Sequence, residues 1–294
     1  MRILRYLLLL LAAATPAFAQ TDLGKIEAHP ALWTVHGKAG TAYLFGSIHI
    51  LPPNIAWHSA KLDAAMAEAD TFVFEVPQDD SGKAEAQAFM AKHGTLPSGT
   101  TLPSLLTPEA RADYDAALTA VHLPPNALDD KRPWLAAIVI EVAMMMREGY
   151  SPDSGIDREI LGYATAHGKS LRYFETITQQ MGMLAPPDTD LEVKEFSVDL
   201  KSLRKEPATL GALVDAWSHA DTRQIDKLMN SDLSKEPGAK KLLLDDRNKA
   251  WVTKLDAMLA EKHTYFITVG AAHLAGPGGV PARLRKAGFQ VEGP

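Results

Sequence analysis

The sequence has 294 residues and no cysteine, and its 36 acidic and 30 basic side chains give a formal net charge of −6 at pH 7. This acidic balance argues against a nucleic-acid partner and against binding to an anionic membrane surface. The lack of cysteine excludes disulfide bonds, thiol nucleophiles and thiolate metal ligands, so any metal would depend on His, Asp and Glu.

Residues 1–19 have the pattern of a secretory signal peptide. Arg2 and Arg5 precede the apolar run YLLLLLAAA, and the small-residue tripeptide AFA at 17–19 is typical of a cleavage site. The apolar run is too short to span a bilayer, so we expect no stable membrane insertion once the signal is removed. The prediction is an exported protein, periplasmic or extracellular, with a single domain over residues 20–294.

Strands and helices are predicted to alternate along the chain. Two short β-like runs flank GKAG and predict a hairpin, and three later runs predict strands, the first of them buried. The strand segments are 31–37, 41–46, 71–76, 170–175 and 264–270, and the helical segments are 59–69, 83–93, 107–121, 134–146, 155–167, most of 176–262, and 281–287. This order indicates an α/β (α+β) fold with a central mixed, largely parallel sheet, flanking helices and a large helical insertion.

The helix predicted at 134–146 is apolar on all sides except at Glu141. A run of this length indicates a buried helix rather than a membrane span. Its methionine triplet at 144–146 is interpreted as core packing, and the alternative is an adaptable peptide groove.

A His or Glu follows each of four predicted strands. His49 and His273 each lie three residues beyond the glycine of a Gly-x-x-His motif, in YLFGSIH and FITVGAAH, and Glu75 and Glu175 end TFVFE and RYFE. Ligands of open α/β sheets bind outside the carboxyl ends of the strands. If these strands are neighbours in the sheet, the four side chains converge.

Two imidazoles and one or two carboxylates suit a divalent metal, with Mn or Co favoured and Zn as an alternative. Such a metal would activate water or polarise a carbonyl group. Without a metal, the same side chains could act as a general base and an orienting acid. The glycines of the two motifs are interpreted as positions where the chain turns sharply and stays slim beside a ligand.

Each of these residues also has a structural interpretation. Glu75 and Glu175 could be solvated carboxylates at strand ends. Arg247 lies off the apolar face of its predicted helix, which is typical of a solvated charge, although its guanidinium would also suit a substrate carboxylate or an oxyanion. In GIDREI, Asp157 is interpreted as a carboxylate near the positive end of a helix dipole.

Taken together, the stretches LWTVHGKAGTAYLFGSIHILPP, FVFEV, GIDREI, LRYFETITQQ, RNKAW and ITVGAAHLAGPGGV resemble the TraB/GumN family, which includes the TIKI proteases. The resemblance runs from about residue 30 to residue 292, over nearly the whole predicted domain. It implies a metal-dependent hydrolase with a fold related to the erythromycin-esterase group, and in TIKI members a Mn- or Co-dependent peptidase.

Carried over by position, the resemblance assigns His49 and His273 to the motif histidines and Glu75 to the strand-end glutamate. Glu75 would join the histidines as a metal ligand and share the catalytic role with Glu175 and Arg247. The expected partner is a peptide or protein substrate. The alternatives are a non-catalytic periplasmic protein that binds a peptide or glycan, and a metal-independent esterase that uses His and Glu alone.

Overall fold

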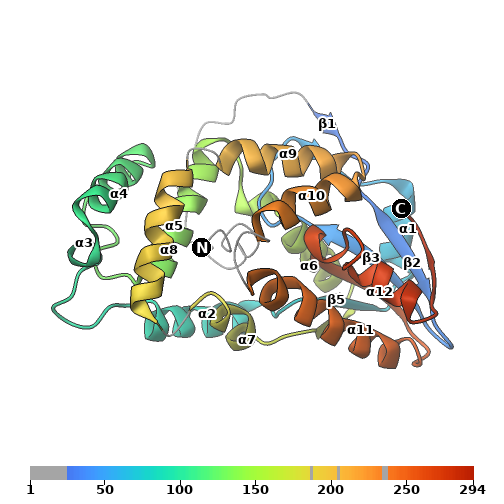
Figure 1. Ribbon diagram of the computed structural model, residues 1–294. Coiled ribbons are helices and arrows are strands. Elements are labelled where there is room, and N and C mark those ends of the chain that lie inside the picture. The colour runs from blue at the N-terminus through green and yellow to red at the C-terminus, as the bar shows by residue number, and fades with distance from the viewer. Residues whose placement is uncertain (1–24, 186–187, 204–205, 234–237) are drawn as a thin grey trace.

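The computed structural model describes residues 25–185, 188–203, 206–233 and 238–294 (Figure 1). The predicted signal peptide, residues 1–19, lies outside the described residues. Among the helices described, none combines the length and the apolar character needed to cross a membrane.

A six-stranded sheet lies at the centre of the fold. Its strands are β2 (Leu32–His36), β3 (Thr41–Ser47), β5 (Thr71–Phe74), β6 (Ser170–Tyr173), β7 (Thr264–Gly270) and β8 (Gln290–Glu292). They are ordered β6-β5-β7-β3-β2-β8. The neighbours β6, β5, β7 and β3 run parallel, whereas β2 is antiparallel to β3 and to β8. The predicted mixed, largely parallel sheet and its hairpin are therefore confirmed. A separate short pair joins β1 (Ile26–Glu27) to β4 (Ile55–Ala56).

Helices cover both faces of the sheet because alternate residues of each strand point to opposite sides. In β5, Phe72 packs in the core beneath the first pair of helices, and Val73 packs beneath the second pair on the other face. The first pair is α1 (Ala60–Glu68) and α6 (Ile156–Ala166), and the second is α11 (Asp246–Met258) and α12 (Val280–Lys286). This arrangement leaves the carboxyl ends of the parallel strands open to side chains from the following loops.

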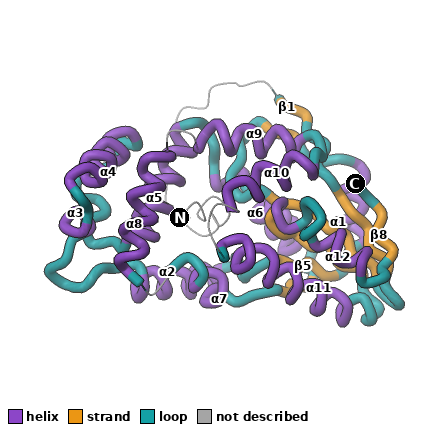
Figure 2. Tube along the Cα trace, viewed as in Figure 1, coloured by secondary structure: helices purple, strands orange, loops and turns teal. Residues whose placement is uncertain are grey.

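A helical region with its own apolar core extends away from the sheet. Its helices are α2 (Asp80–His93), α3 (Leu102–Leu105), α4 (Pro108–Ala120), α5 (Pro133–Arg147), α7 (Ile177–Gly182) and α8 (Thr189–Ser202). Two further helices, α9 (Glu206–Ser218) and α10 (Thr222–Leu233), precede α11 in the chain. Figures 1 and 2 show α3 and α4 at the end of the molecule opposite the strands. The predicted helical insertion is confirmed.

Candidate functional site

The four predicted strand-end residues follow four adjacent parallel strands. β6 and β5 continue their pairing beyond the strands themselves, because Glu175 N–H donates to the Glu75 carbonyl oxygen at 2.7 Å. β7 lies between β5 and β3, so His273 comes from the strand between those of Glu75 and His49. The structure therefore brings all four residues to one edge of the sheet, as the strand pattern indicates.

His49 lies in the loop after β3, and its imidazole faces Asp157, which belongs to the first turn of α6. Ile156 N–H donates to the Ile48 carbonyl oxygen at 3.1 Å, which fixes the start of α6 against this loop. Nδ1 of His49 is 2.5 Å from Oδ2 of Asp157, and the Ser47 hydroxyl donates to Oδ1 at 3.0 Å. A carboxylate only accepts hydrogen bonds, so Nδ1–H of His49 is the donor and Nε2 carries the lone pair.

The environment makes His49 a stronger base than a free imidazole. Burial lowers its pKa, but the charge and hydrogen bond of Asp157 outweigh burial, and the net pKa is raised above 6.5. The charge of Glu75 adds to this rise. Nε2 makes no hydrogen bond to any residue in the described ranges. His49 thus has the features of an oriented general base.

Arg247 is buried at the centre of the site, where all five of its N–H groups are used. Nε–H and one Nη2–H donate to the two oxygens of Glu175 at 2.8 and 3.0 Å. The other Nη2–H donates to Oε2 of Glu75 at 2.5 Å. The Nη1–H groups donate to the Leu243 carbonyl oxygen at 3.1 Å and to Nε2 of His273 at 2.9 Å. The alternative interpretation of Arg247 as a solvated charge is wrong, because the side chain is only 7% exposed.

Local helix geometry explains how Arg247 reaches this position. A π-helical turn, η4 (Lys241–Asp245), immediately precedes α11, and it contains Leu243, whose carbonyl oxygen accepts from Arg247. Such turns are rare in proteins overall, but those that occur are often found at functional sites. Trp251, one turn further along α11, places its ring 4.8 Å from the guanidinium and donates its indole N–H to Glu175 at 2.9 Å. Trp251 therefore contacts both members of the Arg247–Glu175 ion pair and helps to hold them in place.

Glu75 is buried and ionised. Oε1 accepts from Gly270 N–H at 2.7 Å, and Oε2 accepts from the Gln180 amide at 2.7 Å as well as from Arg247. Burial alone raises the pKa of Glu75, but the charge of Arg247, the nearby His273 and His49 and the Gly270 hydrogen bond together outweigh burial and lower the pKa to about 2. A carboxylate held this way is a weak base, and it acts mainly as a fixed negative charge.

His273 is neutral, and its tautomer is set by its neighbours. The Asn248 amide N–H donates to the Gly278 carbonyl oxygen at 3.0 Å, so its oxygen Oδ1 faces Nδ1 of His273 at 2.6 Å. Nδ1 of His273 therefore carries the proton, and Nε2 accepts from Arg247. Burial and then the charge of Arg247 lower the pKa of His273 to about 3.

The two Gly-x-x-His glycines are required for close packing rather than for a sharp turn. Neither has a positive φ angle. A Cβ atom on Gly46 would lie 3.0 Å from Cα of Ala271. One on Gly270 would lie 3.3 Å from Oε1 of Glu75, 3.7 Å from Cδ2 of His273 and 3.9 Å from Nε2 of His49. Gly270 therefore marks the point where the three predicted metal ligands approach one another.

The three predicted metal ligands converge, yet their arrangement does not fit a metal. Within the described ranges, no group of three or more His, Asp or Glu side chains is arranged to hold a metal ion. The chemistry of the donors explains this result. Nε2 of His273 and Oε2 of Glu75 both accept from Arg247, a cation, and Oε1 of Glu75 accepts from a backbone N–H. A metal bound by all three would have to displace Arg247.

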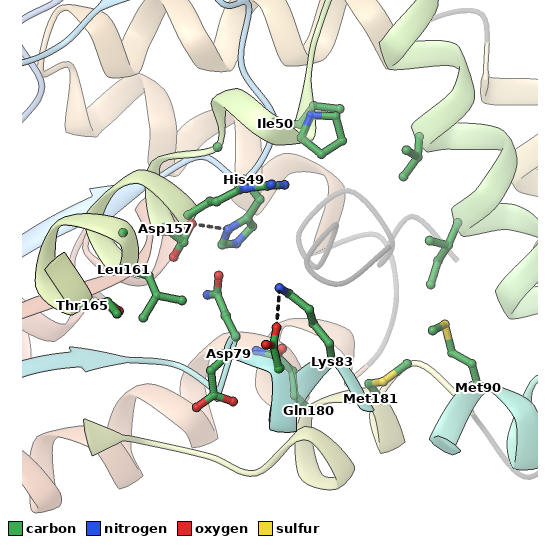
Figure 3. Close-up of a pocket in the computed structure, with 18 of the residues that line it drawn as sticks. His49, Ile50, Asp79, Lys83, Met90, Asp157, Leu161, Thr165, Gln180 and Met181 are labelled. Carbon is green, nitrogen blue, oxygen red and sulfur yellow. Dashed lines mark hydrogen bonds and ion pairs between the residues drawn. The ribbon is translucent and has the colours of Figure 1, made fainter. Parts of the chain in front are cut away.

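Two spaces adjoin the site. A small chamber of about 50 Å³ is lined by His49, Arg247, Gly270, His273 and apolar side chains including Leu243, a volume that accommodates one or two waters. A larger cavity of about 610 Å³ lies between the sheet end and the helical region. Figure 3 shows His49 and Asp157 on one side of this cavity and Met90 across it. Of the five predicted site residues, His49 alone lines both spaces.

Three residues that contact the predicted site residues were not themselves predicted to have a role at the site, namely Asp157, Gln180 and Asn248. Asp157 was interpreted only as a helix-dipole carboxylate, although GIDREI was singled out. Gln180 and Asn248 lie within LRYFETITQQ and RNKAW, stretches that carried the family resemblance. Their residue types alone give no signal of a contact with Glu75 or His273. The methionine triplet at 144–146 does not line the cavity, which α5 borders through Ile138 and Val142. The cavity therefore gives no support to the alternative interpretation of the triplet as a peptide groove.

Comparison with known proteins gives a consistent result. The chain matches the TraB/PrgY/gumN family over residues 31–293. It is 24% identical over 252 residues to "Uncharacterized protein YbaP" of Shigella flexneri, covering 83% of this chain and 88% of that protein. The protein of the same name from Escherichia coli (strain K12) is 24% identical over 251 residues, covering 83% and 87%. No solved structure gives a significant match.

Proposed function

The chain belongs to the TraB/PrgY/gumN family, and we propose that it is a hydrolase in which His49, oriented by Asp157, is the general base for attack by water on an acyl carbon. The observation that carries this proposal is that Nε2 of His49 has no hydrogen-bond partner among the described residues, while His49 lines both the chamber and the cavity. A carboxylate that holds the other imidazole nitrogen is a recurring arrangement in acyl-transfer sites.

The proposed reaction uses one proton transfer in each direction. Nε2 of His49 takes a proton from water in the chamber as the water oxygen bonds to the acyl carbon. The bond to the leaving oxygen or nitrogen then breaks, and His49 returns the proton to that atom. Asp157 stays ionised throughout and stabilises the imidazolium form of His49. An acid and an alcohol, or an acid and an amine, are the products.

Arg247 serves as a positioning residue in this proposal. Its five N–H groups are committed to Glu75, Glu175, His273 and a backbone oxygen, so none is available for an oxyanion without rearrangement. It holds Glu75 ionised, and the charge of Glu75 raises the pKa of His49. Arg247 therefore acts on the base through Glu75, while its own positive charge partly opposes that effect.

Metal-dependent hydrolysis, most simply by a peptidase, is the second candidate. It is favoured by the approach of His49, Glu75 and His273 to one point beside Gly270 and by the resemblance to Mn- or Co-dependent relatives. It requires Arg247 to leave Glu75 and His273. Because the donors do not fit a metal as arranged, the proposal attributes no step of the reaction to one.

The experiment assays the purified protein on activated esters and on a mixture of peptides, with and without a chelator. Metal-free general-base catalysis predicts turnover that survives chelation and falls about 10²- to 10⁴-fold in His49→Ala. Turnover that disappears on chelation and returns with Mn or Co would overturn the metal-free mechanism in favour of the second candidate. A protein that binds peptides or glycans without any turnover would overturn both candidates.

A further inference from the structure

One wall of the large cavity consists of apolar side chains. They come from α2, α5, α7 and the turn after α7, and they are Met90, Ile138, Val142, Met181 and Leu184. Figure 3 shows Met90 and Met181 on the side away from Asp157. None of these five side chains carries an N–H or O–H donor. Apolar ligand surface that packs against this wall is removed from water, which favours binding.

The buried polar side chains beside the cavity are already paired or covered, with one exception. The Gln180 amide donates to Glu75 at 2.7 Å, and Asp157 accepts from His49. Nε2 of Gln78 is buried, so it offers no donor surface to a ligand. Nε2 of His49, in contrast, has no partner within the described ranges. The inner part of the cavity therefore offers a polar contact at His49 and apolar contacts along the wall.

This lining disfavours peptides, sugars and aromatic ligands. A peptide or a sugar against the apolar wall would leave amide or hydroxyl groups without hydrogen bonds, which costs free energy. Among the described residues that line the cavity, none is Phe, Tyr or Trp, so the wall has no ring on which an aromatic ligand could stack. A saturated hydrocarbon chain needs neither kind of contact, and methionine side chains adapt to its shape.

The charged side chains of the cavity lie on its solvent side. Lys83 pairs with Asp80 at 3.2 Å and Arg158 pairs with Asp153 at 2.5 Å, and all four side chains are at least half exposed. Exposed and already paired charges contribute little to binding. They do provide a hydrated boundary beside which the polar part of a ligand can keep its water.

The two spaces beside His49 differ enough in size to separate the reactants. The chamber of about 50 Å³ accommodates one or two waters and is too small for either part of an ester. The cavity of about 610 Å³ lies within the range of pockets that bind small molecules. Water in the chamber and an ester in the cavity would thus meet at His49, which lines both spaces.

We propose that the substrate is an ester of a long saturated carboxylic acid, with its carbonyl carbon at His49, its acyl chain against the wall around Val142 and its alcohol part toward the exposed charges. This inference rests on the proposed hydrolase function, because it names the substrate class of that site. The water oxygen bonds to the acyl carbon, the bond from that carbon to the alcohol oxygen breaks, and the proton taken up by His49 goes to the alcohol oxygen. The products are a fatty acid and an alcohol.

A series of acyl chain lengths tests the substrate class. Hydrolysis of p-nitrophenyl acetate, butyrate, hexanoate and octanoate is followed with the wild-type protein, and His49→Ala gives the background rate. We expect kcat/KM to rise about 3- to 4-fold for each added CH₂ group. A series that is flat or falls from acetate to octanoate would overturn the inference. Faster turnover of the phenylacetate ester than of the octanoate ester would overturn it as well.

A substitution in the wall locates the acyl chain. Val142→Phe fills part of the cavity, so the ratio of kcat/KM for octanoate to that for butyrate should fall at least about 10-fold. Val139→Phe, on the same helix but outside the cavity lining, should leave this ratio as it is in the wild type. Circular dichroism checks the fold of both variants. An unchanged ratio in a folded Val142→Phe protein would contradict the placement of the chain.

Binding of the products measures recognition without turnover. Calorimetry compares decanoic acid with butanoic acid on the wild-type protein. Decanoic acid should bind at least about 100-fold more tightly, because it buries six more CH₂ groups. Its binding should also show a more negative heat-capacity change, the mark of apolar burial. Equal affinity for the two acids would overturn the inference.

The two measurements separate this inference from the proposed function. Tight binding of decanoic acid by a protein that hydrolyses none of the esters would leave the ligand class intact and overturn the hydrolase proposal. Turnover that depends on His49 but not on chain length would support the hydrolase and overturn the ligand class.

Discussion

Oδ2 of Asp157 lies 2.5 Å from Nδ1 of His49, although 108 residues separate them in the sequence. The contact depends on the docking of α6 against the loop after β3. A Cβ atom on Gly155 would lie 2.3 Å from the His49 carbonyl oxygen, so a side chain at this position would push α6 away. The orientation of the proposed base is thus set by helix packing.

Asp157→Asn should change the pH dependence of any turnover. Asp157 raises the pKa of His49, and a general base must be deprotonated to act, so the acidic limb of kcat/KM lies above pH 6.5 in the wild type. Removal of the carboxylate charge should move this limb to lower pH and reduce the maximum rate. The measurement is a pH–rate profile, and an unshifted limb would show that His49 is not the titrating base.

Arg247→Met should strongly destabilise the fold. It leaves Glu75 and Glu175 buried without their counter-charge, and breaking a buried pair in this way costs about 3 to 5 kcal/mol. Denaturant unfolding gives the free energy. The matched control is Arg158→Met, which removes the exposed pair with Asp153 and should cost at most about 1 kcal/mol. Similar losses in the two variants would contradict the assigned role.

The stability of the fold should fall between pH 6.5 and 4.5 because of His273. Its folded pKa is lowered to about 3, so the unfolded chain binds a proton in this interval and the folded chain does not. The free energy of unfolding should therefore drop by about 1.4 kcal/mol per pH unit from this residue. His49, with a raised pKa, contributes its full stabilisation below pH 6.5 and gives no slope here.

Unfolding measured across that interval in wild type and in His273→Gln tests the assignment. The variant should show a flatter profile down to pH 4.5. Below this pH both proteins should lose further stability, because Glu75, with a folded pKa of about 2, is then protonated more readily in the unfolded chain. An identical slope in both proteins above pH 4.5 would exclude a neutral, buried His273.

The two motif glycines should respond differently to alanine. Gly270→Ala places a methyl group 3.3 Å from Oε1 of Glu75 and near both histidines, so turnover should fall at least about 10-fold with little loss of stability. Gly46→Ala meets backbone at 3.0 Å and should lower the free energy of unfolding by about 1 to 3 kcal/mol. Parallel assays of activity and thermal unfolding distinguish the two outcomes.

The predicted signal peptide has a direct test. We propose export with cleavage after Ala19, which would make Gln20 the first residue of the mature chain. N-terminal sequencing of the protein recovered from cell fractions measures this. Full-length protein confined to the cytoplasmic fraction would contradict the proposal.

The strand ends could be predicted from the sequence because they depend on local patterns. Apolar runs of four to seven residues indicate buried strands, and a His or Glu just beyond each run indicates the sheet edge where ligands bind. The adjacency of β6, β5, β7 and β3 was a condition for convergence rather than a prediction, and the structure has this order.

The hydrogen bonds that join the site residues to one another and to their neighbours could not be predicted in the same way. The contacts of Asp157 and Asn248 depend on how α6 and α11 pack on the loops, which no local pattern describes. The position of Arg247 was misjudged because its charge was interpreted as solvated. Arg247 lies one helical turn before Trp251, on the buried side of α11, where Glu75 and Glu175 pair with it.

The π-helical turn before α11 also makes the winding of the chain between α10 and α11 a determinant of the site. Successive residues of an α-helix are rotated by about 100° from one another. If Lys241–Asp245 rewound into regular α-helix with no residue lost, α11 would be offset by about this angle relative to the helix turn before it. Arg247 and Asn248 would then turn away from Glu75 and His273 without any change in their own side chains. A change outside the site that makes this turn regular could thus disrupt the site through rotation alone.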